Sequence, residues 1–101
     1  MRLKVGDTAP SLSFDLNGDT SGATSVTFRM WNAASHIIKI AAGTVTMDTP
    51  AQGLGHYDWQ TADVDTAGMY QAEVRVVYAS GKIQRFPQKG YLEIVIEEAV
   101  S

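Results

Sequence analysis

The sequence predicts an all-β, immunoglobulin-like sandwich of about seven antiparallel strands, formed as a single domain over residues 1–101. Short segments in which apolar and polar residues alternate recur along the chain, separated by clusters of Gly, Asn, Asp and Pro. This period of two is typical of half-buried strands. The length of 101 residues matches one sandwich domain and leaves no room for a second core.

The strand expected over residues 70–78 is the clearest of these segments, and the turn before it is a further observation. Tyr70 enters the strand two residues after Gly68, and Asp65 precedes that glycine by three. A tyrosine at this place is typical of the tyrosine corner, in which the phenol hydroxyl bonds back to the upstream backbone. We therefore expect Asp65, Gly68 and Tyr70 to form a structural corner at the end of a crossover.

The first half of the chain supplies the first strands. In residues 10–16 and 25–31, apolar side chains alternate with polar ones. Residues 36–48 are dominated by β-branched side chains, which indicates two strands broken near Gly43 rather than a helix.

Trp31 departs from the pattern of its strand, because alternation points its side chain away from the core. Either the strand bulges there and the indole enters the core, or the ring lies on the outer face as part of a contact surface. Large aromatic side chains are highly buried on average, which favours the first arrangement.

The second half completes the sandwich. Residues 54–60 alternate again, and the crossover over residues 61–68 suits a single helical turn. Residues 83–86 follow a short connection after the central strand, so the two are expected to pair as a hairpin, and residues 91–98 form the last strand. The expected core collects inward-facing side chains: Phe14, Phe28, Tyr57, Trp59, Val74, Val76, Leu92 and Ile94.

The acidic turn at residues 15–19 is a candidate calcium site. Asp15, Asn17 and Asp19 alternate as at the start of an EF-hand loop. Such a loop needs glycine at its sixth position and glutamate at its twelfth, where this sequence has Thr20 and Val26. A plain surface loop is therefore the favoured interpretation.

Three carboxylates around the crossover are the other candidate for chemistry. Asp58, Asp63 and Asp65 could supply paired carboxylates or a calcium cage. Capping of a turn by Asp63 or Asp65, through bonds to the nearby backbone, explains the same positions and is favoured. His36 and His56 have no second histidine or cysteine at ligand spacing, which favours solvated strand residues.

Motifs for catalysis are missing from the sequence. It has neither a nucleophile elbow nor a phosphate-binding loop, and without cysteine it can form neither a disulfide nor a thiolate metal site. We therefore expect no enzymatic activity, no catalytic residue, no metal and no cofactor, and no small-molecule substrate.

Charge and hydropathy exclude two further classes of partner. The formal net charge is -3, and the eight Lys and Arg residues are scattered, so the basic patch of a nucleic-acid binder is missing. No apolar run reaches bilayer-spanning length, and residues 1–7 lack the apolar stretch of a secretory signal. We expect neither nucleic acid nor membrane as a partner.

Three segments of the chain share their motifs with a known family: Gly6–Pro10 with the strand after it, Val26–Met30, and Tyr57–Glu73 with the Phe86-Pro87 pair and closing strand behind it. From Val5 to Ile96 the chain resembles the immunoglobulin-like domain at the N-terminus of tailed-phage baseplate upper proteins. The resemblance implies a virion structural protein without enzymatic activity. It also implies many copies, assembled in the host cytoplasm and in contact with each other and with other virion proteins.

This resemblance points to a component of the tail or baseplate. A head, neck or capsid-decorating accessory protein of the same fold is one alternative, and a bacterial surface or carbohydrate-binding immunoglobulin-like module is another. Open sheet edges and outward apolar side chains suit docking to other proteins. The candidate interface comprises Trp31, Tyr91 and Val95.

Overall fold

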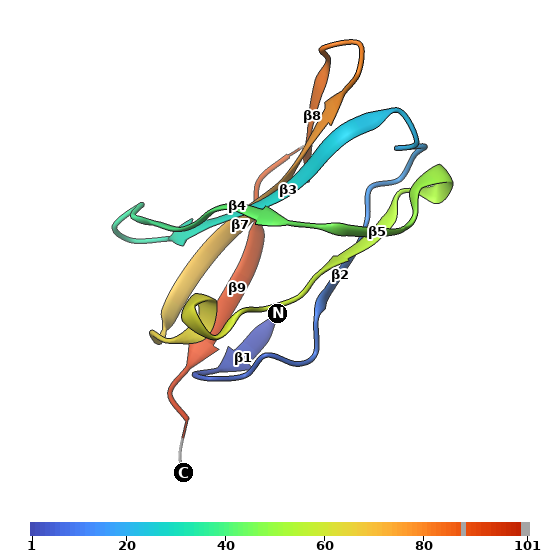
Figure 1. The fold of residues 1–101 in the computed structure, drawn as a ribbon. Helices are drawn as coiled ribbons and strands as arrows, with labels where there is room; N and C mark the ends of the chain where they lie inside the picture. Colours follow the sequence, from blue (N-terminus) through green and yellow to red (C-terminus); the bar gives the residue numbers. More distant parts are fainter. Residues whose placement is uncertain (88, 100–101) are drawn as a thin grey trace.

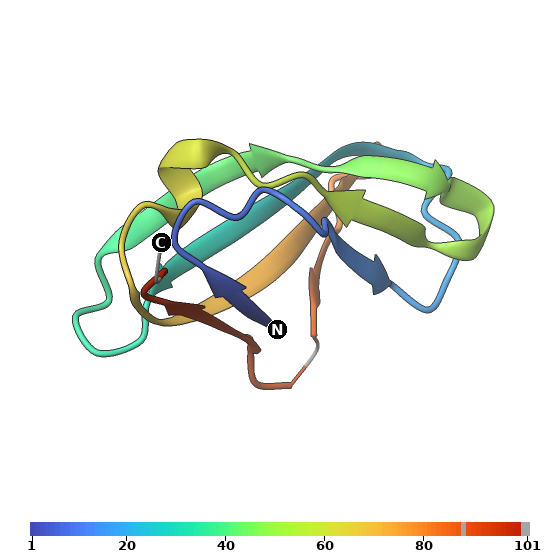
Figure 2. The same ribbon diagram turned by 90° about the horizontal axis from the view of Figure 1, so that it is seen from below.

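The structure is a computed structural model that describes residues 1–87 and 89–99. These residues form nine strands and two short 3-10 helices, arranged as two sheets packed face to face (Figures 1 and 2). The all-β, immunoglobulin-like sandwich predicted from the sequence is confirmed. Residues 88 and 100–101, which belong to the expected single domain over residues 1–101, lie outside the described part.

The larger sheet has six strands in the order β1-β9-β7-β3-β4, and β8 also pairs with β7. β7 is its centre, because it pairs with β3 along one edge and with both β9 and β8 along the other. The bounds of its strands are β1 (Arg2–Lys4), β3 (Ala23–Asn32), β4 (Ile38–Thr44), β7 (Gly68–Tyr78), β8 (Ile83–Phe86) and β9 (Leu92–Glu97).

The smaller sheet is formed by three strands in the order β2-β6-β5. Their bounds are β2 (Leu12–Asp15), β5 (Thr46–Thr49) and β6 (Leu54–Tyr57). Figure 2 shows β4 leading into β5, so that one continuous segment belongs to both layers. The expected break near Gly43 falls at Val45 instead, because Gly43 still pairs with Phe28 of β3.

The strand count and the pairing differ from the prediction of about seven antiparallel strands. The described residues contain nine strands, and the short strand β1 runs parallel to β9 with Leu3 opposite Ile96. In this strand Leu3 lies between two charged residues, and a segment of three residues is too short for alternation to reveal a strand. Leu3 is nevertheless buried, so this strand extends the core beneath the larger sheet.

An aromatic cluster fills the space between the sheets. Phe28 stacks on Tyr57 with ring centroids 4.6 Å apart, and Trp59 lies nearly perpendicular to both rings. Trp59 Nε1 is buried without a hydrogen-bond partner. Seven of the eight expected core residues are buried, and the eighth, Leu92, is half-buried against them. Alternation therefore identified the inward faces of the strands.

The crossover from β6 to β7 is tied down at its far end by Tyr70. The Tyr70 hydroxyl donates a 2.9 Å hydrogen bond to the backbone oxygen of Thr66, and its ring is buried. This bond to an upstream carbonyl has the geometry of a tyrosine corner. Gly68 begins β7, and Asp65 accepts hydrogen bonds from Lys39 of β4 and from the Thr66 hydroxyl.

The middle of the crossover is the 3-10 helix η2 (Thr61–Val64), close to the expected helical turn. Asp63 Oδ2 accepts the backbone N–H of Gln60 at 2.8 Å, three residues upstream, which closes a capping box. The same oxygen accepts the Tyr57 hydroxyl at 2.6 Å. This carboxylate thus links the turn to the core end of β6. The other 3-10 helix, η1 (Pro50–Gln52), connects β5 to β6.

Candidate functional site

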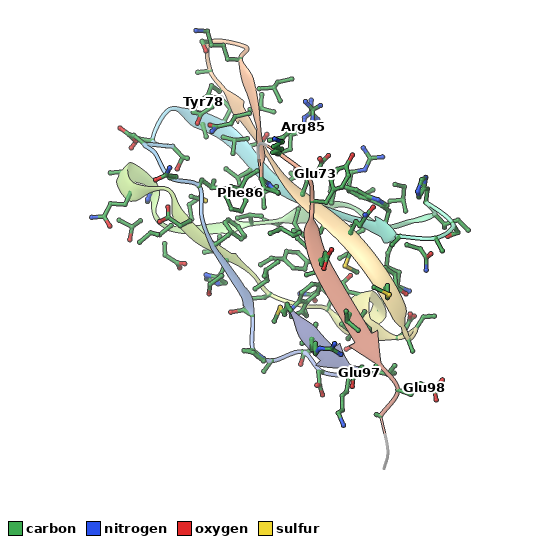
Figure 3. All side chains as sticks on the ribbon, turned by 180° about the vertical axis from the view of Figure 1, so that it is seen from behind. Glu73, Tyr78, Arg85, Phe86, Glu97 and Glu98 are labelled. Carbon is green, nitrogen blue, oxygen red and sulfur yellow. The ribbon has the colours of Figure 1, made fainter. Side chains whose placement is uncertain are left out.

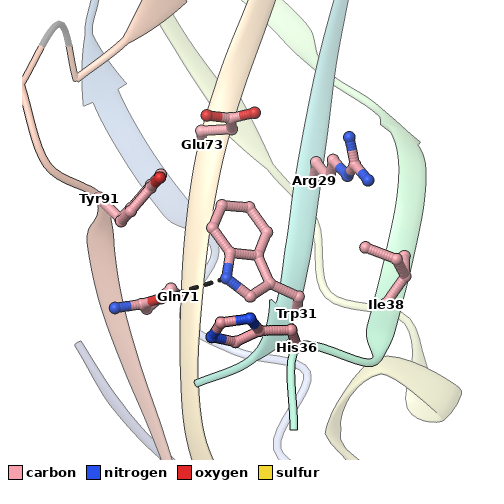
Figure 4. Close-up of a pocket in the computed structure, with 7 residues that line it drawn as sticks. All are labelled: Arg29, Trp31, His36, Ile38, Gln71, Glu73 and Tyr91. Carbon is pink, nitrogen blue, oxygen red and sulfur yellow. Dashed lines mark hydrogen bonds between the residues drawn. The ribbon is translucent and has the colours of Figure 1, made fainter. Parts of the chain in front are cut away.

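The outer face of the larger sheet carries an open groove of about 370 Å³ (Figure 4). Its floor is formed by side chains that alternation directs away from the core, Trp31 from β3 and Gln71 from β7. Arg29 and Glu73 flank the floor one pleat further along the same strands. Around the rim stand His36, Ile38 and Tyr91. We call this feature the Trp31–Tyr91 groove.

Trp31 lies on the outer face, so the expectation that it enters the core is wrong. Along β3 it keeps regular pairing with Gln71 of β7, and the register shift next to it affects only the pairing with β4. The inward positions beside it are already filled by Met30 and by Ala72 opposite, both fully buried. The indole is half-buried because neighbours on the outer face cover part of it.

Two contacts fix the orientation of the indole. Its Nε1 donates a 3.1 Å hydrogen bond to Oε1 of Gln71, and its ring meets Tyr91 edge-to-face with centroids 5.0 Å apart and planes at 87°. Figure 4 shows the indole reaching from β3 across β7 toward Tyr91. Tyr91 itself is 53% exposed. The groove therefore holds a rigid aromatic surface that solvent reaches from one side.

The charged side chains of the groove are of opposite sign but do not neutralise each other. Arg29 and Glu73 are direct cross-strand partners, yet among the described residues no ion pair joins them. Glu73 instead forms an ion pair with Arg85 of β8 on the same face (Figure 3), with 3.9 Å between its Oε1 and the arginine Nε. Arg29 can therefore meet a ligand in the groove, and Glu73, which shares its charge with Arg85, can still accept a hydrogen bond there.

Val95, the third residue of the expected interface, lies apart from the other two. It faces outward on β9 directly opposite Met69 of β7, which is 63% exposed. The turn between β3 and β4 lies beside them, because Ala33 N–H bonds to the Met69 carbonyl, and this turn exposes 70% of Ile37. Ile37, however, lines a hollow with Thr66 and Tyr70 rather than with Met69. We call the pair Met69 and Val95 the end patch. The structure thus places Trp31 and Tyr91 together and Val95 in a separate apolar area.

The acidic turn at residues 15–19 uses its side chains locally. Asp15 Oδ1 accepts the backbone N–H of Asn17, and Asp19 Oδ1 accepts both the N–H and the hydroxyl of Ser21. These bonds, the Ser21 hydroxyl foremost, hold the pKa of Asp19 below its usual range. The carboxylates shape the turn, as a plain surface loop requires.

The three carboxylates around the crossover serve different partners. Asp63 is buried against Tyr57, Asp65 pairs with Lys39, and Asp58 faces the ring of His56. The hydrogen bonds from Lys39 and then Thr66 lower the pKa of Asp65. Within residues 1–87 and 89–99, no three His, Cys, Asp or Glu side chains are grouped to hold a metal ion.

The sequence prediction missed an ion pair on the smaller sheet. His56 of β6 lies between two carboxylates, with Nδ1 2.8 Å from Asp48 Oδ2 and Nε2 3.4 Å from Asp58 Oδ2. The hydrogen bond with Asp48 raises the pKa of His56 against the opposing effect of desolvation. A carboxylate two residues after His56 was visible in the sequence, but the contact with Asp48 depends on the register of β5 against β6.

Comparison with known proteins supports the fold alone. No family model and no curated protein matches the sequence. The structure is similar to the crystal structure of CopC from Methylosinus trichosporium OB3b, with a TM-score of 0.61. The match covers 99% of this chain and 87% of that chain at 11% sequence identity. Both chains are β-sandwiches, and so low an identity carries over no ligand or activity.

No helix in the described part of the chain is long and apolar enough to cross a membrane.

Proposed function

We propose that this chain is a non-enzymatic structural protein of a bacteriophage virion. It acts as a tail or baseplate component through protein–protein contacts in a multi-copy assembly. Two things support the proposal: the resemblance of three sequence segments to the domain of baseplate upper proteins, and a sandwich fold that suits such a domain. The observation that carries the docking role is the end patch.

The end patch leaves apolar surface in contact with water, which does not stabilise a chain that acts alone. Met69 is 63% exposed, and Val95 lies directly beside it on the neighbouring strand. Single exposed apolar side chains are common, but adjoining ones mark surfaces that a partner covers. A partner that covers this patch buries apolar surface, and each Å² buried stabilises the contact by roughly 25 cal/mol. Repetition of such a contact around a symmetric assembly strengthens it further.

The edges of the sheets offer a second kind of contact. In the described residues β1, β4 and β8 are edges of the larger sheet, and β2 and β5 are edges of the smaller one. Such edges present unpaired backbone groups that another chain can extend. A structural array covers them with neighbouring subunits.

Docking through the end patch is tested by a charge placed at Met69. Met69→Glu should leave the fold intact, because this side chain is on the surface, but should reduce incorporation of the chain into particles. Lys82→Glu, in the connection between β7 and β8, is the matched surface control. The readout is the amount of chain in purified particles. Equal incorporation of Met69→Glu and the control would remove the end patch from the proposal.

A head, neck or capsid-decorating role uses the same contacts and differs only in the place of the chain in the particle. Immunogold labelling of intact particles separates these roles from a tail or baseplate position.

A metal-dependent binding module is the alternative to a structural protein of any kind. It should melt at a higher temperature in calcium than in chelator, whereas a structural sandwich should melt alike in both.

A further inference from the structure

The Trp31–Tyr91 groove is distinct from the end patch and goes beyond the proposed function. We propose that this groove binds a neutral carbohydrate, with a sugar ring seated on the indole of Trp31. The ligand class follows from three features of the groove: a fixed aromatic surface, a mixed set of hydrogen-bonding groups, and balanced charge.

The aromatic surface suits the apolar face of a sugar ring. A pyranose ring presents several C–H bonds on one face and its hydroxyl groups around the edge, so it packs by that face on an aromatic plane. The indole of Trp31 is held in place by its bond to Gln71 and by edge-to-face packing with Tyr91. Because the indole is already held in one orientation, the Trp31 side chain loses little conformational entropy when a ligand binds to it.

The polar groups around the indole match the edge of a sugar. Each sugar hydroxyl both donates and accepts hydrogen bonds. The groove offers the guanidinium of Arg29 as a donor and the carboxylate of Glu73 as an acceptor. Because Gln71 uses its Oε1 for Trp31, its amide nitrogen is left to donate. The groove thus provides both donors and acceptors around the indole.

The balance of charge argues against the other ligand classes. A cationic ligand over the indole would meet the like charge of Arg29, and an anionic one would meet Glu73, whose charge the 3.9 Å contact with Arg85 offsets only in part. An apolar peptide segment would strip water from both charges without replacing their hydrogen bonds. A neutral ligand rich in hydroxyl groups avoids each of these costs. The volume of about 370 Å³ lies at the lower end of small-ligand pockets, which suits a short saccharide.

Intrinsic fluorescence tests this site directly, because the chain has two tryptophans and Trp59 is only 3% exposed. A change in the solvent-sensitive emission therefore reports on Trp31. The full chain is titrated with cellotriose, maltotriose, chitotriose and xylotriose at millimolar concentrations. The proposal expects a saturable change with at least one of them, and no change with any of the four overturns it.

Variants locate the binding. Measured by calorimetry with the sugar that binds, Trp31→Ala should weaken affinity by about tenfold or more, and Gln71→Ala by less. Ile83→Ala, an exposed apolar change on β8, is the control and should bind as the unmodified chain does. The emission of Trp59 confirms that Trp31→Ala is folded. Unchanged affinity in Trp31→Ala overturns the proposal.

Incorporation into particles separates this inference from the proposed function. If Trp31→Ala enters particles normally while Met69→Glu does not, the groove is free for a sugar and the docking role stands. If Trp31→Ala is excluded from particles and no sugar binds, the groove is a protein interface. That outcome overturns the carbohydrate site and leaves the structural role intact.

Discussion

Asp63 Oδ2 accepts the hydroxyl of Tyr57 at 2.6 Å inside the sandwich. The same oxygen accepts the backbone N–H of Gln60, so one carboxylate holds both the core aromatic cluster and the crossover turn. Burial foremost, together with Asp63, raises the pKa of the Tyr57 phenol well above its ordinary value. The phenol therefore stays protonated at neutral pH and donates this hydrogen bond to Asp63.

Loss of Asp63 should accordingly cost more than loss of the Tyr57 hydroxyl. Asp63→Ala leaves two donors without an acceptor and should lower the free energy of unfolding by roughly 3 kcal/mol. Tyr57→Phe removes one bond to a charged group and keeps the ring packing, so about 1.5 kcal/mol is expected. Urea unfolding measures both variants, with Asp63→Asn as the isosteric control. The reverse order of effects would contradict this role of the carboxylate.

The hydroxyl of Tyr70 is predicted to stabilise the corner before β7. Tyr70→Phe loses the bond to the Thr66 carbonyl but keeps the buried ring, so the free energy of unfolding should fall by about 1 kcal/mol. Urea midpoints of the two forms are compared, with Tyr91→Phe as the surface control. Equal midpoints for Tyr70→Phe and the unmodified chain would show that the Tyr70 hydroxyl does not stabilise the corner.

Gly43 is predicted to be required where β4 passes over the core. A Cβ at this position would lie 2.5 Å from Cε1 of Tyr57, whose ring is packed against Phe28 and cannot move freely. Gly43→Ala should therefore cost about 1–3 kcal/mol of stability through overpacking. Gly18→Ala, where nothing lies within 4 Å of the added atom, is the matched control. Thermal melts that coincide for both variants would show that the core adjusts without strain.

The pair between His56 and Asp48 predicts a pH-dependent contribution to stability. Because the folded-state pKa of His56 is raised, its contribution is fully present below the ordinary histidine pKa of about 6.5. It is lost as pH rises through the folded-state pKa. The difference in Tm between the unmodified chain and His56→Gln should thus be larger at about pH 5.5 than at about pH 8.5.

His36→Gln shows how much a histidine-to-glutamine change at another surface position shifts the Tm. A His56→Gln difference that stays constant with pH, or grows as pH rises, would contradict the raised pKa.

Alternation in the sequence determined which face each long strand buries. It placed Phe28, Val74 and Ile94 inward, and the spacing of Tyr70 after Asp65 located the corner. What alternation cannot supply is the neighbour on the next strand, which depends on strand order and register. For this reason the sequence could place Trp31 and Tyr91 on outward positions but could not show that they touch.

The same limit explains the other differences. β1 was missed because three residues give no period, and its parallel pairing with β9 joins the two ends of the described chain. Trp31 was expected in the core because average burial of tryptophan was weighed above the pattern of its strand. The groove itself could not be predicted, since its side chains come from β3, the turn after it, β4, β7 and the residue before β9.

The central claim is that this chain is built into a virion, and the content of purified particles tests it most directly. Particles from a lysate in which the gene is expressed are separated on a density gradient, and each fraction is probed with antibody against the chain. The account predicts a signal in the particle fraction, at many copies per particle. Finding the chain only in the soluble lysate, and in no particle or assembly intermediate, would contradict it.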